Sequence, residues 1–260
     1  MLIAIDIGAT KTLVALFSEH GRCLKRIKFL TNKNFTSFQS ELLKNLNPFK
    51  KKKISSVTVA VPAIIEKDCS FSPENLPWKN VNLLPELKSL FKKSKISILN
   101  DADLATLYES GPFKGKTIYL TFSTGIGGGL AKDGAVLKTS ATFEPGHKLY
   151  HFGDSDREWE DLASAKALKR LFRTNVRNIS KNSSFETIAF RLSLGLSDII
   201  NHYHPDTVII GGPLAHIFNH IQPYLINYLF DSVCSLPDFK KAKRPEESVI
   251  YGCYLYGKFH

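Results

Sequence analysis

The chain has 260 residues, of which 43% are hydrophobic and 23% are charged. This ordinary globular composition excludes disordered and fibrous classes, and the length suits one large domain or two domains of roughly 100–150 residues. No apolar run approaches the roughly 20 residues that cross a bilayer, and the N-terminal segment reaches Asp6 too early for a signal peptide. We therefore predict a cytoplasmic protein without a membrane partner.

The formal net charge of +11 makes nucleic acid a partner to consider. The lysines are scattered, however, and the tight basic run at 50–53 lies beside no recognisable nucleic-acid-binding motif. We therefore do not expect nucleic acid as the main partner. The four cysteines are far apart and form no C-x-x-C pair, which predicts reduced, mostly buried thiols.

The first half of the chain alternates between apolar, β-branched runs and segments with helical spacing. Phe38, Leu42 and Leu46, for example, repeat at the spacing of one helix face. The first three runs are typical of an antiparallel meander. Together the patterns predict strands at 2–7, 12–17, 22–30, 54–61 and 96–99, and helices at 35–46, 84–91 and 101–108.

The second half begins again with a strand and a glycine-rich turn. We predict a strand at 117–122, a hairpin partner at 130–137 around Asp133-Gly134, helices at 159–172 and 185–203, a strand at 208–210 with a helix after it, and a closing helix at 248–258. This weak repeat predicts two α/β domains, 1–110 and 111–245. We expect the C-terminal helix, 246–260, to cross back to the first domain.

The first glycine turn carries a compact set of polar groups. Gly8 lets the backbone approach a ligand, and the hydroxyls of Thr10 and Thr12 add hydrogen-bond donors. Lys11 can neutralise phosphate charge, and Asp6 at the end of a strand can hold Mg²⁺ directly or through water. A plain hairpin turn explains the same residues about as well when this turn is taken alone.

Two later turns are also rich in glycine. The run 127–129 places three consecutive glycines in a strand context, which costs conformational entropy without side-chain packing, so we expect close approach to a phosphate. Neither the Walker pattern nor the Rossmann fingerprint is present. For the glycine run at 127–129, the alternative to phosphate binding is a flexible hinge. For Gly211-Gly212-Pro213, the alternative to nucleotide binding is a tight strand-to-helix turn. The candidate phosphate- and nucleotide-binding residues are Thr124, Gly125, Gly127, Gly128, Gly211 and Gly212.

Three such turns in this order resemble the actin-like sugar-kinase superfamily and, more narrowly, the ROK family (repressor, open reading frame, kinase). The resemblance spans nearly the whole chain, and the ordered set of motifs is far more specific than any one of them. It implies an α/β fold of two actin-like (ribonuclease H-like) domains with an interdomain cleft, ATP and Mg²⁺ as cofactors, and a homodimer. The motifs that carry it are DIGATKT at 6–12, NLPW at 75–78, NDA at 100–102, STGIGGG at 123–129, EPGH at 144–147 and IGG at 210–212.

The resemblance also implies roles for individual residues. The first two turns would hold the phosphates of ATP, and Gly211-Gly212 would lie beside the adenosine. Asn100 would bind sugar hydroxyls, and Asp101 would bind the sugar and act as the catalytic base. Sugar contacts would also come from Glu144, His147 and Glu160. As alternatives to these roles, helix capping would explain Asn100 or Asp101, and a favourable charge at a helix N-terminus would explain Glu160.

The chain departs from the family pattern in three places. The segment between His147 and Glu160 contains no cysteine, so we expect no zinc and do not assign His147 as a zinc ligand. A site made of His151, Asp154 and Asp156 is a weak alternative for a metal. Asp103 stands where the family commonly has Asn. We also expect no N-terminal DNA-binding domain, because the first turn begins at residue 6.

Taken together, the sequence predicts ATP-dependent phosphorylation of a hexose or an N-acetylhexosamine, at O6, in the manner of a glucokinase. Two alternatives stay open: a non-catalytic sugar sensor of the same fold, and a kinase for a different small alcohol. Trp78 is expected to pack in a core or hinge rather than to stack on a sugar.

Overall fold

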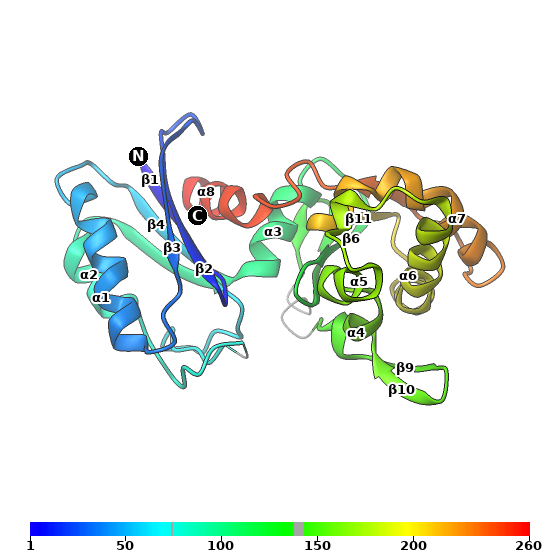
Figure 1. The fold of residues 1–260 in the computed structure, drawn as a ribbon. Coiled ribbons are helices and arrows are strands. Elements are labelled where there is room, and N and C mark those ends of the chain that lie inside the picture. The colour runs from blue at the N-terminus through cyan, green and yellow to red at the C-terminus, as the bar shows by residue number, and fades with distance from the viewer. Residues whose placement is uncertain (74, 138–142) are drawn as a thin grey trace. The chain divides into compact units, whose positions relative to one another are not determined.

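The computed structural model describes residues 1–73, 75–137 and 143–260 (Figure 1). The chain divides into two compact units. Unit 1 comprises residues 1–108 and 249–260, and unit 2 comprises residues 109–248. Each unit combines a five-stranded sheet with helices, so the α/β class predicted from the sequence is confirmed.

The sheet of unit 1 has the strand order β3-β2-β1-β4-β5. The antiparallel meander predicted from the sequence forms its first three strands, β1 (Leu2–Ile7), β2 (Lys11–Phe17) and β3 (Cys23–Leu30). Strands β4 (Ser56–Val61) and β5 (Lys95–Asn100) run parallel to β1. The carboxyl ends of β1, β4 and β5 therefore lie at one edge of the sheet, which places the candidate residues Asp6 and Asn100 at that edge.

The alternation of side chains along β1 sorts the two faces of this sheet. Ile3, Ile5 and Ile7 belong to the core on the face covered by α1 (Phe35–Leu46) and α2 (Leu84–Leu90) (Figure 1). Ala4 faces α3 (Asp101–Ser110) and α8 (Ser248–Phe259). Small residues let α8 approach closely, because a Cβ on Gly252 would overlap the Leu104 carbonyl oxygen.

Trp78 belongs to the first of these cores. Its side chain is 2% exposed, and its ring lies 4.6 Å from that of Phe38. The indole Nε1 donates to the Lys33 carbonyl at 2.9 Å, which satisfies its single polar group. The prediction that Trp78 packs in a core is confirmed.

The sheet of unit 2 has the strand order β12-β11-β6-β7-β8. The strands are β6 (Lys116–Phe122), β7 (Ile126–Lys132), β8 (Ala135–Val136), β11 (Thr207–Gly211) and β12 (Asp238–Lys241). Strand β11 is parallel to β6, so Phe122 and Gly211 end at the same edge. The core of this unit joins the strands to α5 (Ala165–Phe172), α6 (Asn182–Tyr203) and α7 (Phe218–Phe230).

A separate two-stranded hairpin, β9 (Leu149–Phe152) and β10 (Ser155–Glu158), extends from unit 2 and leads into the short helix α4 (Trp159–Ala163) (Figure 1). Among the described residues, 3₁₀ segments include η1 (Asn47–Phe49), η3 (Pro145–His147), η4 (Val176–Asn178) and η5 (Pro213–His216). Across the described residues, no helix combines the length and hydrophobicity that a bilayer crossing needs.

Several expected elements differ from those observed. The predicted helix 159–172 is two helices, because Ser164 is extended at ψ 156° and its side chain accepts from the Ala167 N–H. The segment after Gly212 begins as the 3₁₀ turn η5 instead of an α-helix. The expectation of mostly buried thiols is also wrong, because only Cys253 of the four cysteines is buried, whereas Cys23 and Cys69 are partly exposed and Cys234 is exposed.

Glu109, at the end of α3, holds together the loop that precedes α8. The side chain is 4% exposed, and its carboxylate accepts from the backbone N–H groups of Lys243 at 2.7 Å and Arg244 at 3.0 Å and from the Ser248 hydroxyl at 2.7 Å. We expect Glu109→Ala to lower the free energy of unfolding by about 3 kcal/mol, since the two part-buried backbone N–H groups lose their acceptor and the buried Ser248 hydroxyl loses one of its two acceptors. Urea denaturation measures this, with exposed Glu186→Ala as the control; equal losses in the two variants would contradict the prediction.

Candidate functional site

Two acidic residues lie together at the strand edge of unit 1. Asp6 is the last residue but one of β1 and lies opposite Ala60, and Ala60 is paired with Leu99, two residues before Asp101. Burial and the nearby Asp101 carboxylate raise the pKa of Asp6 to about 7, against the opposing influence of Lys28. Burial also raises the pKa of Asp101, although a hydrogen bond from the Ala102 N–H at 2.8 Å counteracts it. The edge thus holds two carboxyl groups that water stabilises poorly.

Asn100 takes the helix-capping role that the sequence left open. Its Oδ1 accepts from the Asp103 N–H at 3.1 Å, and its Nδ2 donates to the Ala63 carbonyl at 3.3 Å. These two contacts fix the orientation of the amide. Helix capping therefore explains why an asparagine stands at position 100, but it does not explain the carboxyl group of Asp101.

Hydrogen bonds of threonine side chains stabilise the turn between β1 and β2. The Thr31 hydroxyl donates to the Gly8 carbonyl at 2.7 Å, and the hydroxyls of Thr12 and Thr31 are 2.9 Å apart. Thr12 is fully buried, whereas Thr10 and Lys11 are exposed. The hydroxyl of Thr12 was predicted to face a phosphate, but the structure places it inside the turn as a brace.

Glu160, on α4, lies in a niche formed by the backbone of unit 2. The Ile126 N–H donates to its Oε2 at 3.3 Å. A Cβ on Gly125 would overlap the same carboxylate, and a Cβ on Gly146 would come within 2.9 Å of it. Gly125 therefore gives Glu160 its space, and this turn (residues 123–125) also exposes Thr124 to solvent.

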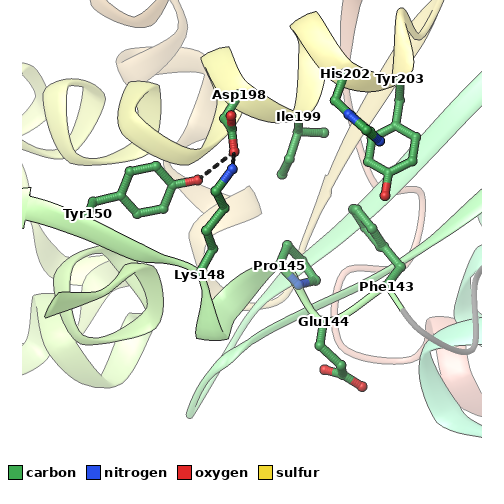
Figure 2. A pocket seen from close by; sticks show the side chains of 9 residues that line it. All are labelled: Phe143, Glu144, Pro145, Lys148, Tyr150, Asp198, Ile199, His202 and Tyr203. Carbon is green, nitrogen blue, oxygen red and sulfur yellow. Dashed lines mark hydrogen bonds and ion pairs between the residues drawn. The ribbon is translucent and has the colours of Figure 1, made fainter.

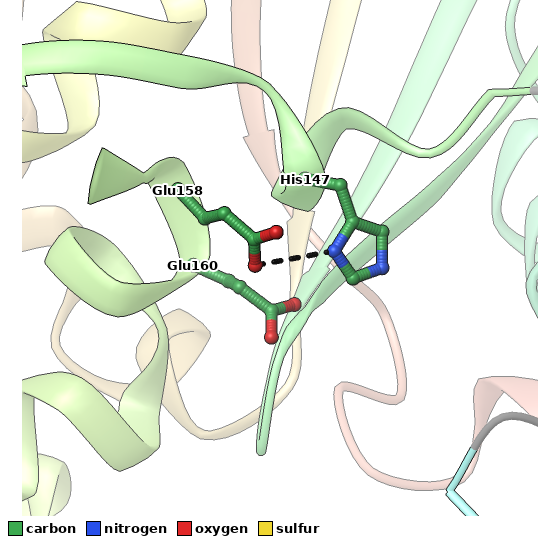
Figure 3. Close-up of side chains that lie close together, drawn as sticks. All are labelled: His147, Glu158 and Glu160. Atoms are coloured by element: carbon green, nitrogen blue, oxygen red, sulfur yellow. Dashed lines mark hydrogen bonds and ion pairs between the residues drawn. The ribbon is translucent and has the colours of Figure 1, made fainter. Parts of the chain in front are cut away.

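His147 and Glu158 meet beside Glu160 (Figure 3). The Nδ1 of His147 is 3.3 Å from a carboxylate oxygen of Glu158. One potential ligand atom from each of the three residues lies within 4.8 Å of the others, a donor set that suits a divalent cation. The weak alternative of a site made of His151, Asp154 and Asp156 is not supported among the described residues: His151 pairs with Asp156 at 3.1 Å on the exposed hairpin, without Asp154.

Packing requires Gly128, Gly211 and Gly212 in the second and third glycine-rich segments, but not Gly127. Gly127 and Gly128 lie inside β7, paired with Thr121 and Leu120, so the strand context predicted for these glycines is confirmed, and the strand predicted to begin at 130 begins at 126. A Cβ on Gly128 would come within 2.6 Å of the Tyr119 carbonyl. Gly212 has φ +69°, and a Cβ there would lie 2.5 Å from the Phe122 carbonyl; Gly211 packs on the Tyr119 ring.

This packing predicts different outcomes for two neighbouring glycines. We expect Gly128→Ala to lower the free energy of unfolding by about 1–3 kcal/mol, because the new methyl group must displace the backbone or the Phe143 ring. Gly127→Ala is the matched control, since its nearest neighbour would be 3.7 Å away. Urea denaturation compares them, and similar losses in both variants would contradict the packing explanation.

A pocket of about 270 Å³ opens behind η3 in unit 2 (Figure 2). Of the predicted site residues only Glu144 belongs to it, and its side chain points away from the others. Lys148 and Tyr150 both contact Asp198 in its wall. The lining residues are Phe143, Glu144, Pro145, Lys148, Tyr150, Asp198, Ile199, His202 and Tyr203.

Several residues of these arrangements, including Thr31, Asp198 and Glu158, were not predicted from the sequence. Thr31 and Asp198 carry no local signal, because each acts through a contact distant in sequence. Glu158 could have been found: Gly153-Asp154 between two short segments is a hairpin signal, and the hairpin brings Glu158 back to His147.

Within the two units the structure thus forms separate clusters. Unit 1 brings together Asp6, Asn100 and Asp101 at one sheet edge, next to the turn of Gly8, Thr10, Lys11 and Thr12. Unit 2 brings together Gly125, His147 and Glu160, whereas the side chain of Glu144 points away from the other pocket residues (Figure 2).

Comparisons with known proteins agree with this architecture. The ROK family matches residues 2–256. The chain is 30% identical to a fructokinase of Lactococcus lactis subsp. cremoris, over 99% of this chain and 95% of that protein. It is 22% identical to a glucokinase of Thermotoga maritima, over 96% and 95% of the two chains. A ROK family glucokinase from Streptomyces griseus, solved in complex with glucose and AMPPNP, shares its two-domain actin-like fold with a TM-score of 0.80, at 18% identity over 97% of each chain. With a family match across nearly its whole length, this chain belongs to the ROK family.

Proposed function

We propose that this chain is an ATP-dependent sugar kinase that phosphorylates O6 of a hexose or an N-acetylhexosamine. Its relatives named fructokinase and glucokinase support the class of reaction. The observation that carries the proposal is the pair Asp6 and Asp101 at the parallel-strand edge of unit 1, where each carboxyl group has a raised pKa.

Asp101 is the proposed general base. ATP supplies the γ-phosphoryl group, and Asp101 accepts the proton of the attacking sugar hydroxyl. The transition state of phosphoryl transfer is loose, so the proton leaves late and the position of the carboxylate matters more than its basicity. The raised pKa of Asp101 increases its capacity to accept that proton. Asn100, fixed by its two hydrogen bonds, would present its amide to a neighbouring hydroxyl.

The phosphate-binding groups proposed for unit 1 are those that the turn leaves accessible. Thr10 and Lys11 are exposed beside the backbone of Gly8. Asp6 fits Mg²⁺, because it offers hard carboxylate oxygens and because a cation would stabilise a carboxylate whose pKa is raised by burial and by Asp101. In unit 2 we propose Thr124 and Gly125, with the backbone of Gly127, Gly128, Gly211 and Gly212, for contacts to the nucleotide.

Glu144, His147 and Glu160 are the proposed sugar-binding residues of unit 2. The backbone niche around Glu160 and the contact between His147 and Glu158 hold two of these side chains in place. Carboxylate and imidazole groups suit the recognition of several hydroxyls, since each accepts or donates hydrogen bonds in a fixed direction.

A coupled assay tests the proposal. ATP, Mg²⁺ and a panel of glucose, fructose, mannose, N-acetylglucosamine and N-acetylmannosamine should give ADP with at least one sugar, and ³¹P NMR should place the phosphate on O6. The 6-deoxy analogue of the best sugar should bind without turnover. Phosphorylation of the 6-deoxy analogue would refute O6, and sugar binding without turnover of any panel member would favour the sensor.

A further inference from the structure

His147 and Glu160 are thirteen residues apart, yet the β9–β10 hairpin closes the chain between them. At the base of the hairpin the Trp159 N–H donates to the Lys148 carbonyl at 2.9 Å. The contact between His147 and Glu158 lies next to this bond. The two proposed sugar-binding residues are therefore held together by the base of the hairpin.

The base is attached to one face of α6. The Trp159 indole is fully buried, donates to the Arg191 carbonyl at 3.0 Å and packs where Gly195 has no side chain. Asp198 follows Gly195 by three residues and so lies on the same face. Arg191 also donates to the Leu162 carbonyl at 3.0 Å, which holds the end of α4.

Asp198 binds the other side of the base. One carboxylate oxygen pairs with the Lys148 ammonium group and accepts from the Tyr150 hydroxyl at 3.1 Å (Figure 2). Burial and Asp198 both raise the pKa of Tyr150, so the tyrosine stays a neutral donor at physiological pH. Lys148 directly follows His147, and hence Asp198 restrains the chain one residue from a proposed sugar contact.

We propose that Asp198 is a positioning residue of the sugar site: it fixes Lys148 and Tyr150 on α6 and thereby sets the place of His147 beside Glu160. This inference rests on the proposed function. Trp159 anchors the α4 side of the hairpin base in the core, whereas Asp198 and Lys148, at 39% and 57% exposure, anchor the η3 side at the surface. Loss of Asp198 should therefore loosen the His147 side and leave the core intact.

Asp198→Asn tests the inference, with Asp231→Asn as a control that removes the same charge from another exposed site in unit 2. We expect Asp198→Asn to raise KM and Kd for the sugar at least fivefold, while KM for ATP and kcat change less than twofold. Tyr150→Phe should raise the sugar KM less, and Asp198→Glu should restore part of the affinity. Amide hydrogen exchange should quicken in β9 and β10 of Asp198→Asn and stay unchanged in α6.

An unchanged sugar KM in Asp198→Asn would overturn the inference, and so would equal losses for sugar and ATP, which indicate a general structural defect. Failure of the proposed function would be seen separately, as absence of turnover and of sugar binding in the parent protein. Unchanged hydrogen exchange in β9 and β10 would also overturn the claim that Asp198 restrains the hairpin, whatever the parent's activity.

Discussion

Asp101→Asn should lower kcat by roughly 10²–10⁴-fold, the range that general-base catalysis contributes. Asparagine has nearly the same shape, and its amide oxygen can still accept from the Ala102 N–H, so the start of α3 should stay folded. It cannot accept the hydroxyl proton, however. Initial rates with saturating sugar, ATP and Mg²⁺ measure the loss, and isothermal titration should show that the sugar still binds.

Asp103→Asn is the matched control, because it removes a carboxyl group from the same first turn of α3. Asp103 contributes to the raised pKa of Asp101, so its removal should lower that pKa and shift the acid limb of the rate profile to lower pH. Activity at neutral pH should stay within tenfold of the parent. Turnover of Asp101→Asn within tenfold of the parent would refute its role as the base.

Asp6→Asn should make the protein more stable at pH 8 than the parent, by up to about 4 kcal/mol at about 1.4 kcal/mol for each unit of pKa. The folded-state pKa of Asp6 is about 7 and its ordinary value is 3.8. Between these values the folded protein binds the proton more tightly than the unfolded chain. Raising the pH through this window therefore destabilises the parent, and asparagine removes that loss.

The measurement is urea denaturation from pH 4 to pH 8 with EDTA present, so that no divalent cation offsets the buried charge. The stability difference between Asp6→Asn and the parent should widen as the pH rises and level off above about 7. Parallel curves would contradict the prediction. Asp231→Asn reports the effect of removing an exposed charge. The variant should also lose activity if Asp6 holds Mg²⁺, which would explain why a destabilising carboxyl group stands there.

Local patterns were sufficient for most of the fold. The β-branched runs of β1, β4 and β11 and the apolar spacing of α1 identify buried elements without any long-range information. Parallel strands then bring Asp6 and Asn100 to one edge, which the order of strands and helices already suggests. Ser164 shows where local patterns fail. The apolar spacing over 159–172 is that of one continuous helix, but Ser164 caps a second helix and so ends the first.

The glycines show why site residues are harder to predict than elements. A glycine required by a ligand and a glycine required by a neighbouring side chain give the same sequence signal. Only the structure shows that Gly125 makes room for Glu160 and that Gly128 packs against Tyr119. Similarly, the buried partner of Thr12 is Thr31, and no pattern of spacing identifies such a pair.

Unit 1 cannot complete its core without helix α8, which is far from the rest of the unit in the sequence. Its residues Ile250 and Cys253 complete the core around Ala4, Ala15 and Phe17, nearly the full length of the chain away. Unit 2 is continuous in sequence, so residues 109–248 are enough to complete it, whereas unit 1 also needs residues 249–260. Without those residues, one face of the sheet of unit 1 is left uncovered. A chain shortened to residue 248 should therefore consist of a folded unit 2 joined to an aggregation-prone N-terminal half.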